Sequence, residues 1–161
     1  MGILKWTLYA VLFLFSMLLQ EIILPRMTIS GIALCAVPVC VVCIAVQEGV
    51  EHSALFALLA GTVFCLSGVD CGPLYIVTLT LSAVLAGALC DRYYTRSFVP
   101  ALLLSLLGLT ICEGLAFLFR IYIGVVAPAL WQTVLLPEIL LSVLDFPLFY
   151  LGAWAVSRIG R

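Results

Sequence analysis

Three acidic residues stand inside or beside apolar stretches and are the first candidates for chemistry: Asp70, Glu113 and Asp145. An ionised carboxylate at the centre of a membrane costs about 3 kcal/mol or more unless it is paired or hydrated. Carboxylates in such places commonly bind a solute, a proton or a partner protein. Each of the three therefore has two possible roles, a functional one and a structural one.

Asp70 lies between Gly68 and the pair Gly72 and Pro73, in the passage SGVDCGPLY. Glycine and proline supply the backbone conformations of a turn, and an acidic residue stabilises the N-terminus of the helix that follows. We expect Asp70 to form this turn and cap. Recognition of a partner is the alternative.

Glu113 precedes Arg120 by seven residues, which is two helical turns or about 10 Å. The two side chains share a face of one helix without having to touch. We expect Glu113 to face the interior of a helix bundle, either protonated or hydrogen-bonded to a polar group on another helix.

Asp145 lies near the middle of the last apolar stretch, and Pro147 two residues later removes a backbone donor and bends the helix. Two interpretations stay open. Asp145 contacts a substrate, a proton or a partner, or it is a protonated acid bonded to the carbonyls that the proline frees.

Motifs for catalysis and metal binding are missing from the sequence. It contains no Ser-His-Asp set, HExxH, P-loop or EF-hand pattern, and Cys40 and Cys43 have no second cysteine or histidine pair to complete a metal site. His52 is expected to be solvated in a turn over residues 47–52. We therefore expect no cofactor, no metal and no enzyme, although the acids Glu113 and Asp145 leave intramembrane chemistry open.

The elements that position these residues are apolar helices. Of 161 residues, 66% are apolar and 9% are charged, and a spanning helix needs roughly 20 apolar residues. We predict an all-α polytopic membrane protein, a single domain over 1–161 with six transmembrane helices. The expected spans are 6–25, 29–46, 53–69, 73–90, 98–120 and 134–157. The basic residues form no cluster, so no nucleic acid is expected as a partner.

Two features of the sequence bear on the shape and packing of the expected helices. The second and third are short, and Pro38 and Gly68 make a tilted or broken helix plausible there. Small residues recur at helical spacing, as Ala57 with Gly61 and Ala83 with Gly87. This spacing favours close packing of the third and fourth spans against each other or against a partner.

Basic residues in short loops predict the orientation. Six spans place five of them on one side and two on the other: Lys5, Arg92, Arg96, Arg158 and Arg161 against Arg26 and Arg120. Both termini are therefore expected in the cytoplasm. The connection 121–133 then lies outside. It is apolar and uncharged, and is expected to lie along the lipid interface or against a partner.

Several passages together resemble the MreD family of rod shape-determining proteins. They are LQEIILP in the first span, the passage from Glu48 to Tyr75, LAGAL in the fourth span and LDFPLF in the sixth. The stretch from Gly61 to Asp70 resembles the family's Gly-rich third segment with its acidic residue. Asp145 stands where family members often carry a polar residue.

The resemblance implies a bundle similar to the S-components of energy-coupling-factor vitamin transporters. It also implies a non-enzymatic scaffold of the bacterial cell-elongation machinery in the cytoplasmic membrane. Such a scaffold holds the bitopic protein MreC beside MreB, RodA and a penicillin-binding protein. We expect its partner to contact the outer region, for which the candidate residues are Asp70, Glu113, Arg120, Tyr122, Val126, Trp131 and Asp145.

The alternative is a transporter subunit that binds a small molecule such as a vitamin, with the acids lining its cavity. An S-component is expected to carry small residues on its first span for docking to its transporter. The first span here, WTLYAVLFLFSMLL, is bulky instead, which favours the scaffold.

Overall fold

The computed structural model describes residues 2–23, 35–67, 72–93, 97–125 and 135–159. All elements among these residues are helical, which confirms the all-α prediction for this part of the chain. The α-helices are α1 (Gly2–Leu18), α2 (Ala36–Glu48), α3 (Val50–Leu66), α4 (Gly72–Tyr93), α5 (Phe98–Tyr122), α6 (Leu135–Ser142) and α7 (Phe146–Ile159). A π-helical turn, Leu19–Ile23, extends α1, and a 3-10 turn, Val143–Asp145, joins α6 to α7.

Four helical stretches are long and apolar enough to cross a membrane: Ile3–Ile22, Pro73–Tyr93, Phe98–Tyr122 and Leu135–Arg158. The helices α2 and α3 are apolar but shorter, with 13 and 17 residues. The structure thus supports a polytopic membrane protein. The prediction that the second and third segments are short is confirmed, while the number of six spans stays a prediction.

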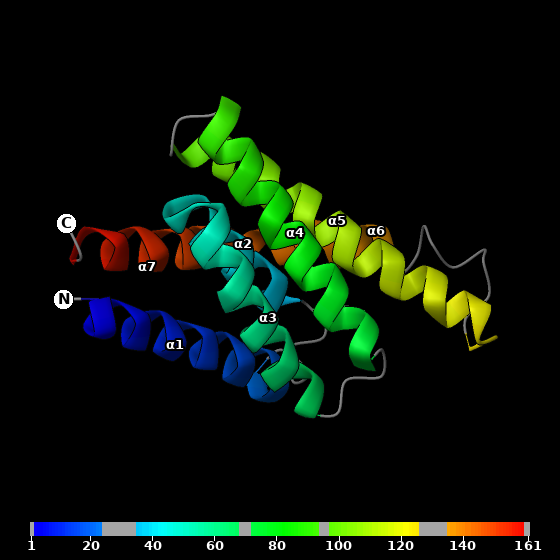
Figure 1. Ribbon diagram of the computed structural model, residues 1–161. Coiled ribbons are helices and arrows are strands. Elements are labelled where there is room, and N and C mark those ends of the chain that lie inside the picture. The colour runs from blue at the N-terminus through cyan, green and yellow to red at the C-terminus, as the bar shows by residue number, and fades with distance from the viewer. Residues whose placement is uncertain (1, 24–34, 68–71, 94–96, 126–134, 160–161) are drawn as a thin grey trace.

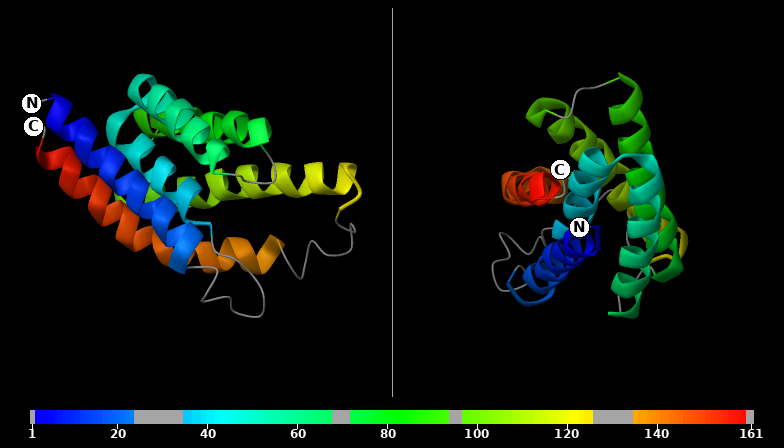
Figure 2. Two further views of the ribbon diagram at one scale, coloured as in Figure 1. Left: turned by 90° about the horizontal axis from the view of Figure 1, so that it is seen from below. Right: turned by 60° about the vertical axis from the view of Figure 1, so that its left-hand side comes forward.

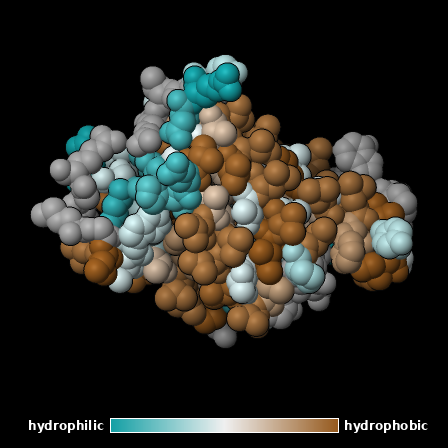
Figure 3. All heavy atoms as spheres, in the orientation of Figure 1, coloured by the Kyte–Doolittle hydropathy of each residue, from teal (hydrophilic) through white to brown (hydrophobic). Residues whose placement is uncertain are grey.

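The helices run back and forth between two ends of the molecule (Figure 1). Helices α1 and α7 lie side by side, and both chain ends and the α2–α3 turn lie at one end (Figures 1 and 2). The last turn of α5 lies at the other end. On the face shown in Figure 3, hydrophilic residues gather where α2 meets α3 and where α4 ends, whereas the surface over α3 and α4 is hydrophobic.

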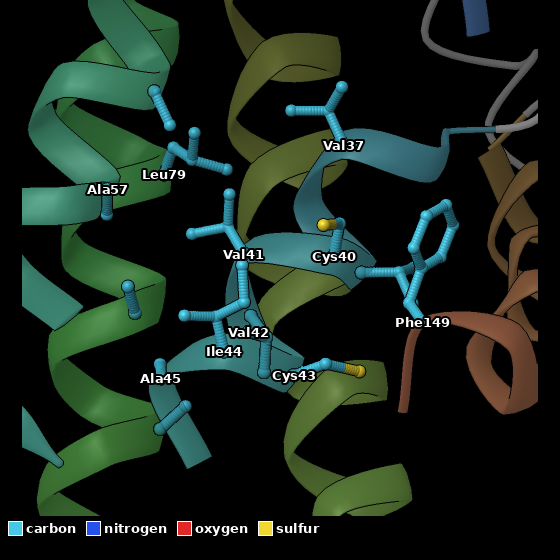
Figure 4. Close-up of a cluster of buried hydrophobic side chains, with 14 of the residues drawn as sticks. Val37, Cys40, Val41, Val42, Cys43, Ile44, Ala45, Ala57, Leu79 and Phe149 are labelled. Carbon is cyan, nitrogen blue, oxygen red and sulfur yellow. The ribbon is translucent and has the colours of Figure 1, made fainter. Parts of the chain in front are cut away.

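Helix α2 occupies the centre of the bundle and packs against α1, α3, α4, α5 and α7. Every residue from Ala36 to Gln47 is buried. A helix that is apolar all round can lie in the core of a protein or face lipid, and α2 lies in the core, where its small and β-branched side chains are surrounded by the neighbouring helices. In Figure 4, Val41 and Leu79 lie on one side of α2 and Phe149 on the other.

Two expectations about this region are corrected. Pro38 does not break a helix, because α2 begins at Ala36 and Pro38 falls in the first turn, where its missing N–H costs no helical hydrogen bond. The expected turn over 47–52 contracts to Gly49, which has φ of 85°. A Cβ at this glycine would lie 2.8 Å from Oδ2 of Asp91, the same oxygen that accepts a hydrogen bond from the Val50 amide.

Helices α3 and α4 pack closely through glycine, as the small-residue spacing predicts. A Cβ on Gly61 would lie 3.0 Å from the Cα of Ile76, and one on Gly87 would lie 3.1 Å from the Val50 amide nitrogen. At both positions the obstacle is backbone. Glycine therefore sets the distance between these two helices.

The end that holds both termini carries a polar network. The Lys5 Nζ lies 2.7 Å from Oε2 of Glu48, and the Tyr9 hydroxyl donates a 2.5 Å hydrogen bond to its Oε1. Arg92 and Arg158 stand in the last turns of α4 and α7, which lie at this same end (Figure 1). These residues group as the charge pattern predicts, and the side of the membrane they occupy stays a prediction.

Candidate functional site

A buried glutamate on α5 is the starting point of the site. Glu113 is only 4% exposed, and the Tyr75 hydroxyl of α4 donates a 3.1 Å hydrogen bond to its Oε1. The prediction that Glu113 faces the interior is confirmed. Of the two states expected for it, the structure shows the hydrogen bond to another helix.

Two further groups meet Glu113 at the start of α2. The Cys35 thiol lies 3.5 Å from Oε1 of Glu138 on α6, as a donor to that oxygen. The Sγ of Cys35 and carboxyl oxygens of Glu113 and Glu138 all lie within 4.8 Å of one another. We call Cys35, Tyr75, Glu113 and Glu138 the polar cluster.

The backbone around the polar cluster is held by a serine. The Ser142 hydroxyl accepts a 2.8 Å hydrogen bond from the Cys35 amide and donates one of 2.7 Å to the Glu138 carbonyl. Ser142 is fully buried. It therefore ties the start of α2 to α6, which are 107 residues apart in sequence.

Arg120 supplies positive charge to the polar cluster. It interacts electrostatically with both Glu113 and Glu138. The helical spacing of Glu113 and Arg120 thus brings them into electrostatic reach. Two carboxyls, a thiol and a phenol beside one guanidinium can hold a proton or coordinate a cation.

Sequence reasoning missed three members of the polar cluster: Cys35, Tyr75 and Glu138. Glu138 stands in the apolar run LLPEILLS, so the reasoning that selected Glu113 applies to it equally. Cys35 stands in the apolar run IALCAVPVC, where a cysteine ordinarily behaves as a small hydrophobic residue. No local pattern marks the thiol, because its acidic neighbours come from distant segments.

Asp145 lies in the 3-10 turn that interrupts the helix just before Pro147, so the predicted irregularity is confirmed. Its side chain is half-buried. Its Oδ2 is enclosed and has no hydrogen-bond partner among the described residues. The bond to freed carbonyls, expected on the structural interpretation, is therefore not made by this oxygen.

The remaining candidates lie at the far end of α5 or outside the described residues. Tyr122 is 87% exposed. Asp70, Val126 and Trp131 fall outside the described residues, as does most of the connection 121–133. Among the described candidates, Glu113 and Arg120 thus belong to one site. Tyr122 and Asp145 are not part of it.

An apolar groove runs along the outside of α5 and has a volume of about 640 Å³. A Cβ on Gly114 would meet nothing within 4 Å among the described residues. We call this surface the Gly114 groove. It is lined by Thr110, Ile111, Gly114, Leu115, Phe117, Leu118, Ile121 and Leu135.

A second apolar groove, of about 510 Å³, lies between α1 and α3. Trp6, Phe13 and Phe56 contribute its aromatic lining, and the His52 ring stacks on Trp6 at 5.8 Å. The expectation that His52 lies in a turn is corrected, whereas its expected exposure is confirmed. His52 is exposed, but it belongs to the first turn of α3, and Trp6 covers one face of its ring.

No family model, curated protein or solved structure matches the chain.

Proposed function

We propose that the chain is a non-enzymatic membrane scaffold of the MreD kind, which binds the single transmembrane helix of an MreC-like partner. The resemblance of the sequence passages supplies the class of partner. The observation that supports a docking surface for this helix is the open Gly114 groove.

Packing against the described residues does not explain the glycine at position 114. Glycine inside a helix lowers stability by roughly 0.5–1 kcal/mol relative to alanine. At Gly61 and Gly108 a neighbouring residue occupies the space that a Cβ would need. At Gly114 no described residue does so, which leaves the helix backbone open to a partner.

The chemistry of the Gly114 groove suits a transmembrane helix. Lipid tails are as apolar as side chains, so helices associate in membranes through close packing at small residues. Thr110 and Gly114 are four residues apart and both line the groove. The groove extends to Ile121, the first residue of the connection 121–133, which we expect to lie along the lipid interface or against a partner.

The centre of the bundle favours a scaffold over a carrier. A protein that moves a solute through its middle needs a polar cavity there, whereas α2 fills this place with buried apolar residues. The alternative, a subunit that binds a small molecule in the manner of an S-component, draws its support from the polar cluster. A vitamin-sized molecule retained by the purified protein in native mass spectrometry would favour that alternative.

The proposed setting is the bacterial cytoplasmic membrane, with both termini in the cytoplasm. MreB, RodA and a penicillin-binding protein are the proposed neighbours in the elongation machinery. None of these contacts requires an extramembrane domain on this chain.

The test is co-purification of a tagged MreC-like protein with Gly114→Leu, which fills the groove. We expect capture to fall at least about tenfold relative to the wild type, since the lost close approach corresponds to about 1.4 kcal/mol or more. Ala155→Leu, which introduces the same side chain on an exposed face of α7, is the control and should capture normally. Full capture by Gly114→Leu would refute the docking surface.

Crosslinking locates the partner independently. A photoreactive residue at Leu118 should crosslink to the partner's transmembrane helix, as should one at Val126 or Trp131. Crosslinks confined to the α2–α3 turn would place the partner on the opposite end and contradict the proposal.

A further inference from the structure

We propose that the polar cluster binds a divalent transition-metal ion of the zinc type, with Cys35, Glu113 and Glu138 as its ligands. This departs from the expectation, drawn from the missing sequence motifs, that the chain holds no metal. The inference does not depend on the scaffold function.

The ligand types suit this class of ion. Thiolate sulfur selects zinc and similar metals over Mg²⁺ and Ca²⁺, which prefer oxygen alone, and carboxylate oxygen completes many zinc sites. Three protein ligands leave a fourth tetrahedral position for water. The ligands come from the residue before α2, from α5 and from α6, so an ion would join three segments.

The distances between the ligand atoms also suit a zinc-type ion. Zinc–sulfur and zinc–oxygen bonds of about 2.3 and 2.1 Å at a tetrahedral angle place the two ligand atoms about 3.6 Å apart. The Cys35 Sγ and Glu138 Oε1 are 3.5 Å apart. All three ligand atoms lie within 4.8 Å of one another, so side-chain rotation alone brings Glu113 into the same sphere.

The charges around the polar cluster favour a cation. Two carboxyls this close repel each other when ionised, and burial strengthens the repulsion. Arg120 interacts with both, and its single charge balances one of them. Binding of a divalent ion releases the Cys35 thiol proton to solvent. The thiolate-bound ion then neutralises the remaining negative charge.

The ligands are already oriented by neighbours. Tyr75 donates to Glu113, and Ser142 fixes the Cys35 amide against the Glu138 backbone. Hydrogen bonds of this kind hold metal ligands in place, and their loss typically lowers metal affinity about 10–100-fold.

Cobalt titration of the full chain in nanodiscs tests the proposal. We expect CoCl2 to produce the near-ultraviolet charge-transfer absorption of a cobalt–thiolate bond, saturating at a single ion per chain. ZnCl2 should displace the cobalt and abolish the absorption. Absence of the absorption at saturating CoCl2 would overturn the proposal.

Substitutions of single residues test which side chains bind the metal. Cys35→Ser should abolish the absorption, and Glu138→Gln should weaken cobalt binding at least about tenfold. Cys43→Ser is the matched control, because Cys43 is a buried thiol of α2 outside the polar cluster, and it should bind cobalt as the wild type does. An absorption that survives in Cys35→Ser, or that disappears in Cys43→Ser, would assign the metal to other thiols and overturn the proposal.

Glu138→Gln also guards against a folding defect in Cys35→Ser. Glu138 is half-buried, and glutamine keeps its shape. Metal content per folded chain, measured after size-exclusion chromatography, should fall in this variant. Unchanged metal content would refute a ligand role for Glu138 and with it the proposed site.

Discussion

At the scale of single residues, Glu48 connects two helices at the end that holds both termini. It accepts hydrogen bonds from Lys5 and from Tyr9, and its side chain is 9% exposed. Hydrogen bonds to a charged group contribute about 1.5–3 kcal/mol. These bonds join the first turns of α1 to the end of α2.

Replacing Glu48 by Gln removes the charge and keeps the shape. We expect the free energy of unfolding to fall by about 1–3 kcal/mol, measured by thermal or denaturant unfolding in detergent. Glu51→Gln, at an exposed residue three positions away, should change stability little. Equal effects of the two substitutions would contradict a structural role for the Glu48 network.

Asp145 differs from Glu48 because its enclosed Oδ2 has no partner among the described residues. Asp145→Asn therefore removes a charge from a carboxyl group with one enclosed oxygen that accepts no hydrogen bond from the described residues. We expect unchanged or higher thermal stability and normal capture of the MreC-like partner. Loss of capture with normal folding would show that an ionised carboxylate acts there.

At the scale of elements, two glycines on different helices have opposite roles. Gly61 lets α3 approach the backbone of α4, whereas Gly114 faces an open groove on α5. The same substitution should therefore change stability in opposite directions at the two positions. Comparing the two variants therefore distinguishes the effect of packing between helices from the effect of helix propensity.

Gly114→Ala should raise the free energy of unfolding by about 0.5–1 kcal/mol, because alanine favours the helix and its Cβ would meet none of the described residues within 4 Å. Gly61→Ala should lower it by about 1 kcal/mol, since strain against Ile76 exceeds the gain in propensity. Unfolding of both variants without a partner measures this. Stabilisation by Gly61→Ala would show that α3 and α4 separate at little cost.

At the scale of the whole molecule, the helices return the chain to the end from which it starts (Figure 1). If the bundle crosses the membrane along this direction, both termini lie on the same side. Lys5, Arg92 and Arg158 at that end predict the cytoplasmic side.

Reporter fusions test this topology. A fluorescent protein fused to either terminus should fluoresce, and alkaline phosphatase fused to either should stay inactive, because both reporters remain in the cytoplasm. A phosphatase fusion after Tyr122 should be active. Opposite results at the two termini would refute an even number of crossings.

The apolar composition, the presence of long apolar helices and the close approach of α3 and α4 were predictable from the sequence. Each depends on local properties: the length of an apolar run, the spacing of small residues or the position of a proline. Glu113 was recognised for the same reason, since a charge within an apolar helix stands out. The sequence did not reveal that Gly49 alone forms the turn between α2 and α3. Residues 47–52 were expected to form a longer turn, because their packing against α4 could not be foreseen.

The sequence by itself determined that the chain is helical, apolar and poor in charge, because these properties are sums over local residues. Only the tertiary structure decided that α2 lies at the centre, that Gly114 faces an open groove, and that Cys35, Tyr75, Glu113 and Glu138 meet. Contacts between segments as far apart as Cys35 and Glu138 depend on how helices pack. Helices that are apolar on most faces carry little information in their sequence about which face meets which neighbour.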